Sequence, residues 1–194
     1  MNAELAREII AAWGVHGAPQ HDQVVVLFER VRDIRYGDIG SRDPEAVYRR
    51  GVGTCSGKHE LLKALYHELG IETQDWIAMH RFNNLPVEFP TAIREILDRT
   101  EIIDPHNFFK IPVNGRWTTI DVTWDLPLRR LGFPVTVDWD GWSEMDVCVT
   151  ADEVFETDDP LGRKRALIEA LPEVVRADRK LFLTRLTTWL ETQR

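Results

Sequence analysis

Apolar side chains recur at helical spacing in the first third of the chain. Residues 2–13, about 20–33 and 55–69 each place apolar side chains on one face of a helix. Asp43-Pro44 is typical of an N-cap followed by proline at the first helical position, so a short helix is predicted from there to about Arg50. The leucines of the segment 55–69 indicate that this helix is buried.

The middle of the chain changes to the alternation that is typical of strands. Residues 71–79 alternate loosely, and residues 101–113 and 116–124 are rich in β-branched and aromatic side chains. Asn114-Gly115 lies between the last two segments and is a strong signal for a two-residue hairpin loop, so an antiparallel pair is predicted. Residues 83–98 contain prolines and a short helical run, and they are interpreted either as a lid or as a packed excursion.

The last third of the chain is predicted to be irregular at first and then helical. Residues 145–150 are expected to add one strand. Residues 157–160 are typical of a helix cap, and residues 171–173 restart a second helix with an apolar stripe. No internal repeat, low-complexity tract or linker divides the chain, so residues 1–194 are expected to form a single domain.

Charge and composition argue against several classes of function. The chain has 24 Lys and Arg against 32 Asp and Glu, a net charge of −8, and a pI of about 5.3. No cluster of basic residues would match a phosphate backbone, so nucleic acid is not expected as a partner. The apolar runs are far shorter than the roughly 20 residues of a membrane helix, and the N-terminus lacks the order of a secretion signal. We therefore expect a cytoplasmic protein with no membrane partner, in which the two cysteines are thiols.

Cys55 lies where a reactive thiol could form. It follows a glycine-rich turn, Gly51-Val52-Gly53-Thr54, and begins a helix whose unpaired N–H groups and macrodipole would stabilise a thiolate. The flanking glycines let the chain turn sharply and let a substrate approach the backbone. The alternative is that Cys55 is a small buried residue, because buried cysteines are common. Cys148 is interpreted in that second way.

The hairpin register brings a histidine and a carboxylate together. If Asn114-Gly115 is the loop, Val113 pairs with Arg116. His106 and Asp121 then become diagonal neighbours on one face, with Cβ atoms roughly 7 Å apart and within reach of a hydrogen bond. Phe108 and Trp117 share this face, and the opposite side is expected to face the core with Phe109, Ile111, Ile120, Val122 and Trp124.

Cysteine, histidine and an orienting carboxylate are the parts of an activated-thiol site for acyl transfer. Asp121 would fix the imidazole tautomer and His106 would take and return the proton. Cys55 would attack a carbonyl to give a thioester. The alternatives are a solvent-facing strand histidine at His106 and an acid near a loop at Asp121.

Three motifs in this order resemble the core of the transglutaminase-like superfamily. The motifs are Gly51-Val52-Gly53-Thr54-Cys55 with the apolar helix after it, Asp104-Pro105-His106, and Asp121-Val122-Thr123-Trp124-Asp125. The resemblance spans about residues 24–125, and residues 126–194 would be a C-terminal extension packed on that core. It implies an α+β, papain-like fold, in which the nucleophile helix packs on an antiparallel sheet with flanking N- and C-terminal helices.

The resemblance implies catalytic roles for Cys55, His106 and Asp121, in acyl transfer or hydrolysis at an amide or ester carbonyl through a thioester. The substrate would be a peptide, a protein or a small amide or ester, and the choice between peptidase, amidase and transglutaminase stays open. A catalytically inert binding or scaffold module of the same superfamily is the alternative.

The predicted substrate-binding residues are Gly53, Thr54, Phe108, Trp117 and Trp124. For the tryptophans a place in the core is the alternative interpretation. The family usually has an aromatic residue, often tryptophan, two positions after the histidine, and Phe108 keeps this wall but loses the indole donor. The second oxyanion donor, beside the backbone N–H of Cys55, is not located by the sequence.

No cofactor and no metal site are predicted. His59-Glu60-Leu61-Leu62-Lys63 comes close to the zinc-protease pattern, but Lys63 removes the second ligand. His59 and His67 are roughly 12 Å apart along the helix, too far to share one metal without other ligands. Both are therefore interpreted as packing or surface residues, whereas His80 either lines the site or has an ordinary structural role.

Overall fold

A four-stranded antiparallel sheet forms the centre of the molecule. This computed structural model describes residues 1–193 and gives the strand order β5-β4-β3-β6. The strands of this sheet are β3 (Gln74–Arg81), β4 (Ile103–Val113), β5 (Arg116–Ile120) and β6 (Ala151–Glu156). A second, parallel pair consists of β1 (Arg35–Tyr36) and β2 (Val52–Gly53).

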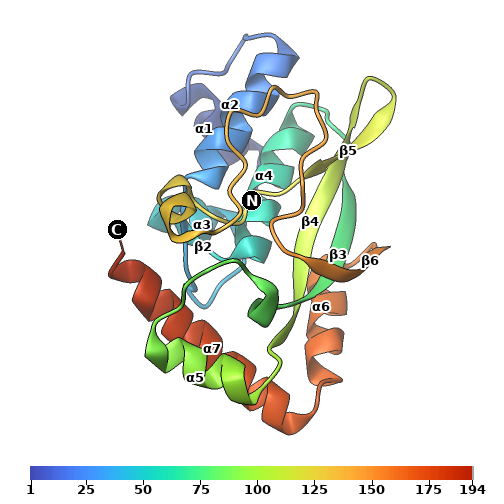
Figure 1. Cartoon of the computed structure of the whole chain (residues 1–194). Coiled ribbons are helices and arrows are strands. Elements are labelled where there is room, and N and C mark those ends of the chain that lie inside the picture. The colour runs from blue at the N-terminus through green and yellow to red at the C-terminus, as the bar shows by residue number, and fades with distance from the viewer. Residues whose placement is uncertain (194) are drawn as a thin grey trace.

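Helices from the N-terminal and C-terminal parts of the chain cover the sheet (Figure 1). The helices are α1 (Ala3–Ala12), α2 (Gln20–Arg32), α3 (Pro44–Arg50), α4 (Cys55–Glu68), α5 (Thr91–Arg99), α6 (Pro160–Glu169) and α7 (Glu173–Glu191), with 3-10 turns η1 (Phe82–Asn84) and η2 (Leu126–Leu131). α4 packs on β4 and is covered by α1, α2 and α3, while α6 contacts β3 and β4. α5 and α7 lie side by side at the lower end in Figure 1. The expected α+β class, with the Cys55 helix packed on an antiparallel sheet, is confirmed.

The hairpin has the predicted register. Val113 pairs with Arg116, and the ladder continues to the pair of Phe109 with Ile120. Asn114 and Gly115 have φ angles of 50° and 75°, as the two-residue turn between twisted strands requires. The second strand is shorter than predicted, because it ends at Ile120 and the chain then bends away.

The prediction of a strand over residues 145–150 is wrong. The strand β6 begins after this segment and spans Ala151–Glu156. The backbone of the predicted segment serves other partners, which explains the difference. The N–H of Cys148 donates to the Asp121 carboxylate at 2.8 Å, and its carbonyl accepts from the Trp124 indole at 3.0 Å. Side chains thus satisfy backbone groups that a strand ladder would otherwise use.

Residues 83–98 form a packed excursion and not a free lid. Its apolar side chains Leu85, Phe89, Ile93 and Ile96 are buried. They pack in one cluster with Tyr36, Trp124 and the α7 residues Phe182, Leu186 and Leu190. Residues of the C-terminal extension, 126–194, therefore share a hydrophobic core with residues of the segment 24–125.

A second cluster lies between α4 and the hairpin. Four of the five residues predicted to face the core, Phe109, Ile111, Ile120 and Val122, are in this cluster with leucines of α4. Trp124 belongs instead to the cluster around α7, because the chain has left the hairpin before it reaches that position. The cluster between α4 and the hairpin therefore fixes α4 relative to β4 and β5.

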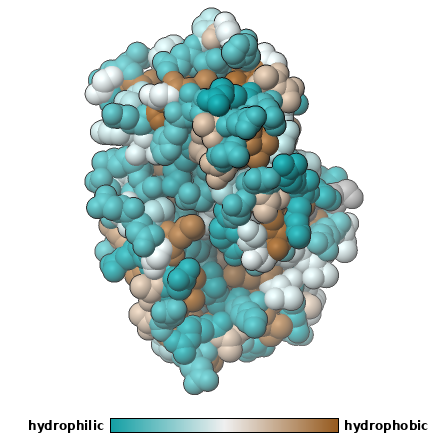
Figure 2. All heavy atoms as spheres, turned by 180° about the vertical axis from the view of Figure 1, so that it is seen from behind, coloured by the Kyte–Doolittle hydropathy of each residue, from teal (hydrophilic) through white to brown (hydrophobic). Residues whose placement is uncertain are grey.

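The surface is mainly polar. Figure 2 shows a hydrophilic face with hydrophobic residues in several separate places. The large apolar side chains that are exposed are Trp117, Leu126, Trp142, Val154, Val174 and Leu181. Within residues 1–193 we find no helix with the length and apolar character needed to span a bilayer.

Candidate active site

Cys55 begins α4, and the residues before it set the local geometry. α3 ends at Arg50 and is capped by Gly51, whose φ of 60° lies in the left-handed region that glycine adopts without strain. β2 follows and pairs with β1. Thr54 then caps α4, since its side chain accepts a hydrogen bond from the N–H of Gly57 at 3.5 Å. The thiol therefore lies in the first turn of a helix, at the positive end of the macrodipole.

Gly53 has a packing role in this turn. A Cβ at this position would lie 2.9 Å from the Val47 side chain and 3.2 Å from that of Lys58, so α3 and α4 leave no space for one. The buried ammonium of Lys58 also joins segments here, because it donates to the carbonyl oxygens of Arg32 at 2.8 Å and Thr123 at 2.9 Å. Close packing is sufficient to explain the glycine, and the predicted contact of Gly53 with substrate stays a prediction.

His106 and Asp121 are in direct contact. His106 Nε2 lies 2.6 Å from Asp121 Oδ2, and both side chains are buried. The carboxylate also accepts hydrogen bonds from the N–H of Cys148 at 2.8 Å and from the N–H and hydroxyl of Thr123 at 3.1 and 2.6 Å. Donors therefore hold both oxygens of Asp121. Because Nε2 is engaged by the carboxylate, Nδ1 is the ring nitrogen left to exchange a proton.

His59, interpreted from the sequence as a packing or surface residue, is a neighbour of this pair. It lies one turn after Cys55, and its Nδ1 donates to the Cys55 carbonyl oxygen at 2.6 Å. Its Nε2 accepts the N–H of Val122 at 3.2 Å and lies 3.4 Å from Asp121 Oδ1. The ring meets His106 edge-on, with 6.1 Å between the ring centroids. The spacing of four residues from Cys55 is the sequence signal that points to this position.

Lys164 of α6 lies against the thiol, a contact that no local sequence pattern predicts. Its Nζ is 3.5 Å from Cys55 Sγ and 3.6 Å from Asp104 Oδ2. Asp104 in turn accepts a hydrogen bond from Arg179 Nε at 2.6 Å and lies 3.8 Å from His80 Nε2. Both C-terminal helices therefore contribute charged groups to the space around Cys55.

The surrounding charges favour the thiolate form of Cys55. Burial alone would raise the pKa of this thiol, but the positive charge of Lys164 and the adjoining imidazolium of His106 outweigh it and hold the pKa well below its usual range. Burial would also lower the pKa of His106, yet Asp121 and then Cys55 raise it to about 10. The imidazolium outweighs burial at Asp121 too and lowers the pKa of that carboxyl. A thiolate–imidazolium pair is the state that these directions favour at neutral pH.

The open space at Cys55 is small. The residue is 5% exposed and borders a cavity of about 50 Å³. Side chains from α6, from α7 and from the segments on either side of α3 line this cavity, among them Tyr36, Arg42, Thr54, Lys164, Arg179 and Leu183. Thr54 therefore lines this cavity, and its predicted contact with substrate stays a prediction. Access to the sulfur depends on the side chains of the C-terminal helices.

The predicted aromatic residues are not gathered around the thiol. Phe108 is buried and stacks on Trp76, with 6.3 Å between ring centroids. Trp124 is buried behind Tyr36, with 4.4 Å between centroids, so it supports a residue of the Cys55 cavity and does not line it. Trp117 is 43% exposed and lies by the C-terminal end of α4, at the opposite end of that helix from Cys55. The core interpretation fits Trp124. Trp117 is not in the core, and the predicted contacts of Phe108 and Trp117 with substrate stay predictions.

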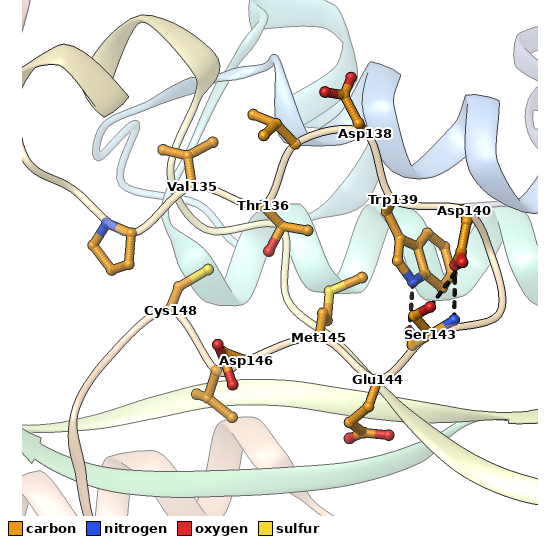
Figure 3. A pocket seen from close by; sticks show the side chains of 13 residues that line it. Val135, Thr136, Asp138, Trp139, Asp140, Ser143, Glu144, Met145, Asp146 and Cys148 are labelled. Carbon is orange, nitrogen blue, oxygen red and sulfur yellow. Dashed lines mark hydrogen bonds between the residues drawn. The ribbon is translucent and has the colours of Figure 1, made fainter.

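A wider hollow lies next to Asp121. It has a volume of about 420 Å³ and is lined by residues 134–140 and 143–148. Figure 3 shows Cys148 and Met145 on its wall, with Trp139 bonded to Ser143 at one end. Two of its lining residues bond to Asp121: the N–H of Cys148 donates to the carboxylate, and the Met145 sulfur accepts from the Asp121 N–H at 3.2 Å. Cys55 does not line this hollow, so its size says nothing about access to the thiol.

No protein-family model matches the chain, and no curated protein matches it. One similar solved structure is described as a "Putative Cysteine Protease" from Cytophaga hutchinsonii, with 17% sequence identity and a TM-score of 0.44. The match covers 66% of this chain and 40% of that protein, so it spans less than half of the other protein's length.

Proposed function

We propose that the protein is a transglutaminase-like thiol enzyme with a papain-like core, which uses Cys55, His106 and Asp121 for acyl transfer or hydrolysis at an amide or ester carbonyl. The observation that carries this proposal is the buried contact of 2.6 Å between His106 and Asp121, beside a cysteine at a helix N-terminus. The low pKa of the Cys55 thiol and the high pKa of His106 are both what an activated thiol requires.

In the proposed reaction the Cys55 thiolate attacks the carbonyl carbon and forms a C–S bond, while N–H groups at the start of α4 stabilise the oxyanion. His106 gives its Nδ1 proton to the leaving amine or alcohol, so the C–N or C–O bond breaks and a thioester remains. Water or an acceptor amine then loses a proton to His106 and attacks the thioester. The acyl product leaves, and the thiolate and imidazolium are restored. Asp121 keeps the imidazole oriented throughout.

The covered position of the thiol favours a second candidate, an inert module that keeps the fold and has lost turnover. Cys55 is 5% exposed, and Lys164 occupies the space against its sulfur. In that case the chain would bind a partner without forming a thioester. The same experiment separates the two candidates.

The test exposes the intact protein to a panel of activated esters and amides and locates any acyl group by mass spectrometry. We expect a hydroxylamine-labile adduct on Cys55 that is lost in Cys55→Ala and in His106→Ala, while Asp98→Asn, an exposed acid, keeps it. A labelled primary amine and a glutamine peptide then separate amine transfer from hydrolysis. Absence of any Cys55 adduct across the panel would favour the inert module.

A further inference from the structure

The cation against Cys55 is not part of the proposed triad. Lys164 belongs to α6, which follows the triad residues in sequence, and its Nζ lies 3.5 Å from Sγ. At this distance the ammonium of Lys164 is in direct contact with the sulfur, which is the proposed reacting atom. The side chain is 14% exposed, so water screens the interaction only in part.

Asp104 fixes the ammonium in this position. Its carboxylate lies 3.6 Å from Lys164 Nζ and also binds Arg179 of α7, which donates to the same carboxylate from Nε at 2.6 Å. Asp104 itself is held by β4, two residues before His106. One carboxylate thus serves two cations, which leaves the Lys164 charge available to a second anion. The thiolate is the anion within reach.

On this geometry, and resting on the proposed function of Cys55, we infer that Lys164 is a fourth catalytic residue of this site. Its ammonium is the counter-ion of the Cys55 thiolate and directs anionic electrophiles to the sulfur. α6 then contributes a functional residue to the site and does not only cover it. Once the sulfur is acylated its negative charge is gone, and the ammonium faces the acyl group without that partner. Acyl donors with a negative charge near the scissile carbonyl are the class of substrate that this charge would favour.

Several other charged and titratable groups face Lys164 and Cys55 and also influence the ionisation of the thiol. They are Tyr36 of β1, Asp38 and Arg42 before α3, Asp104 and His106 of β4, and Arg179 of α7. His80 of β3 lies 3.8 Å from Asp104 and edge-on to His106. All of these are unchanged in a variant of position 164. A shift on substitution of Lys164 therefore reports the charge of that residue.

The test measures alkylation of Cys55 against pH with neutral iodoacetamide and with anionic iodoacetate, by peptide mass spectrometry. Variants are Lys164→Gln, Lys164→Arg and the control Arg165→Gln, which removes the same charge from an exposed position on the same helix. For Lys164→Gln we expect the midpoint of the iodoacetamide profile to rise by about 1–3 pH units. The ratio of iodoacetate to iodoacetamide rates should fall about fivefold or more. Lys164→Arg should restore both values in large part, and Arg165→Gln should leave both unchanged.

The midpoint of the pH profile and the rate at high pH distinguish an effect of the Lys164 charge from an effect on access to the sulfur. Removing a covering side chain would raise the rate at high pH, where the thiol is fully ionised in every variant, but would not move the midpoint. An unchanged midpoint or an unchanged ratio in Lys164→Gln, with the fold intact by circular dichroism, overturns the inference. A Lys164-dependent profile in a protein that never forms a thioester would leave Lys164 as the counter-ion of the thiolate, but it would refute the proposed function and with it the catalytic role of Lys164. A Cys55 thioester with a Lys164-independent profile would do the reverse.

Discussion

Asp121→Asn is the substitution whose effect the geometry defines most closely. The carboxylate receives donors on both oxygens, from His106 and Cys148 on one and from Thr123 on the other. An asparagine has one acceptor oxygen and one NH₂ group, so in either orientation the NH₂ faces a donor. The variant therefore loses the negative charge and leaves at least one buried donor without an acceptor.

The magnitude follows from the titration of His106. Its pKa of about 10, against an ordinary value of 6.5, corresponds to roughly 5 kcal/mol of preference for the imidazolium. Burial opposes this preference, Asp121 is the larger of the two groups that produce it, and Cys55 is the other. Removing the Asp121 charge should therefore remove at least about half of this preference for the imidazolium. The pKa of His106 then falls by about 2 units or more. The unpaired donor should lower the free energy of unfolding by a further ~1–3 kcal/mol.

The assay is an NMR titration of the imidazole Cε1–H signals, with His106 assigned among the 6 histidines by its loss in His106→Gln. Acyl transfer by Asp121→Asn should fall as well, because the carboxylate no longer holds the imidazole in the orientation and tautomer that the reaction needs. Asp98→Asn should change neither. If His106 titrates near its ordinary value in the unsubstituted protein, or keeps its high pKa in Asp121→Asn, the reasoning about this pair is refuted.

Further predictions concern stability and the limits of the site. Burial lowers the pKa of Lys58 to about 7, so above that pH the unfolded chain binds the proton more tightly and stability rises with pH. From pH 7 to 9 the free energy of unfolding of the unsubstituted protein, relative to Lys58→Met, should increase by about 2–3 kcal/mol in urea titrations; a constant difference would contradict this. Gly132→Ala should destabilise by more than Gly40→Ala, although both glycines have positive φ angles. Only at Gly132 would a Cβ collide with the carbonyl oxygen of Pro86, and equal shifts in Tm would argue against that contact. Trp117→Ala should leave acyl transfer unchanged within about twofold, because the side chain lies at the far end of α4; a large loss would return Trp117 to the site.

Local sequence signals account for the parts of the site that could be predicted. Thr54 before an apolar run defines the start of α4, and Asn114-Gly115 fixes the hairpin register by its need for positive φ. That register is enough to bring His106 to Asp121, although the second strand ends before the latter. Each of these signals lies within a few residues of the feature it predicts.

The parts that could not be predicted depend on contacts between distant segments. Lys164 is 109 residues from Cys55 in sequence, and nothing around it differs from an exposed helical lysine until α6 is packed on the sheet. The bond between Asp121 and the N–H of Cys148 likewise spans 27 residues, and it replaces the strand expected at 145–150. In both cases tertiary contacts override a local pattern.

The central claim is that Cys55 is a thiolate because the ammonium of Lys164 and the imidazolium of His106 stabilise its negative charge. The most direct measurement is an ultraviolet titration of thiolate absorbance in the native protein and in Cys55→Ala. We predict a Cys55-dependent step well below the usual pKa of a thiol, whereas burial and Asp121 place the step of Cys148 above it. A Cys55 step at or above the usual thiol pKa would contradict the account.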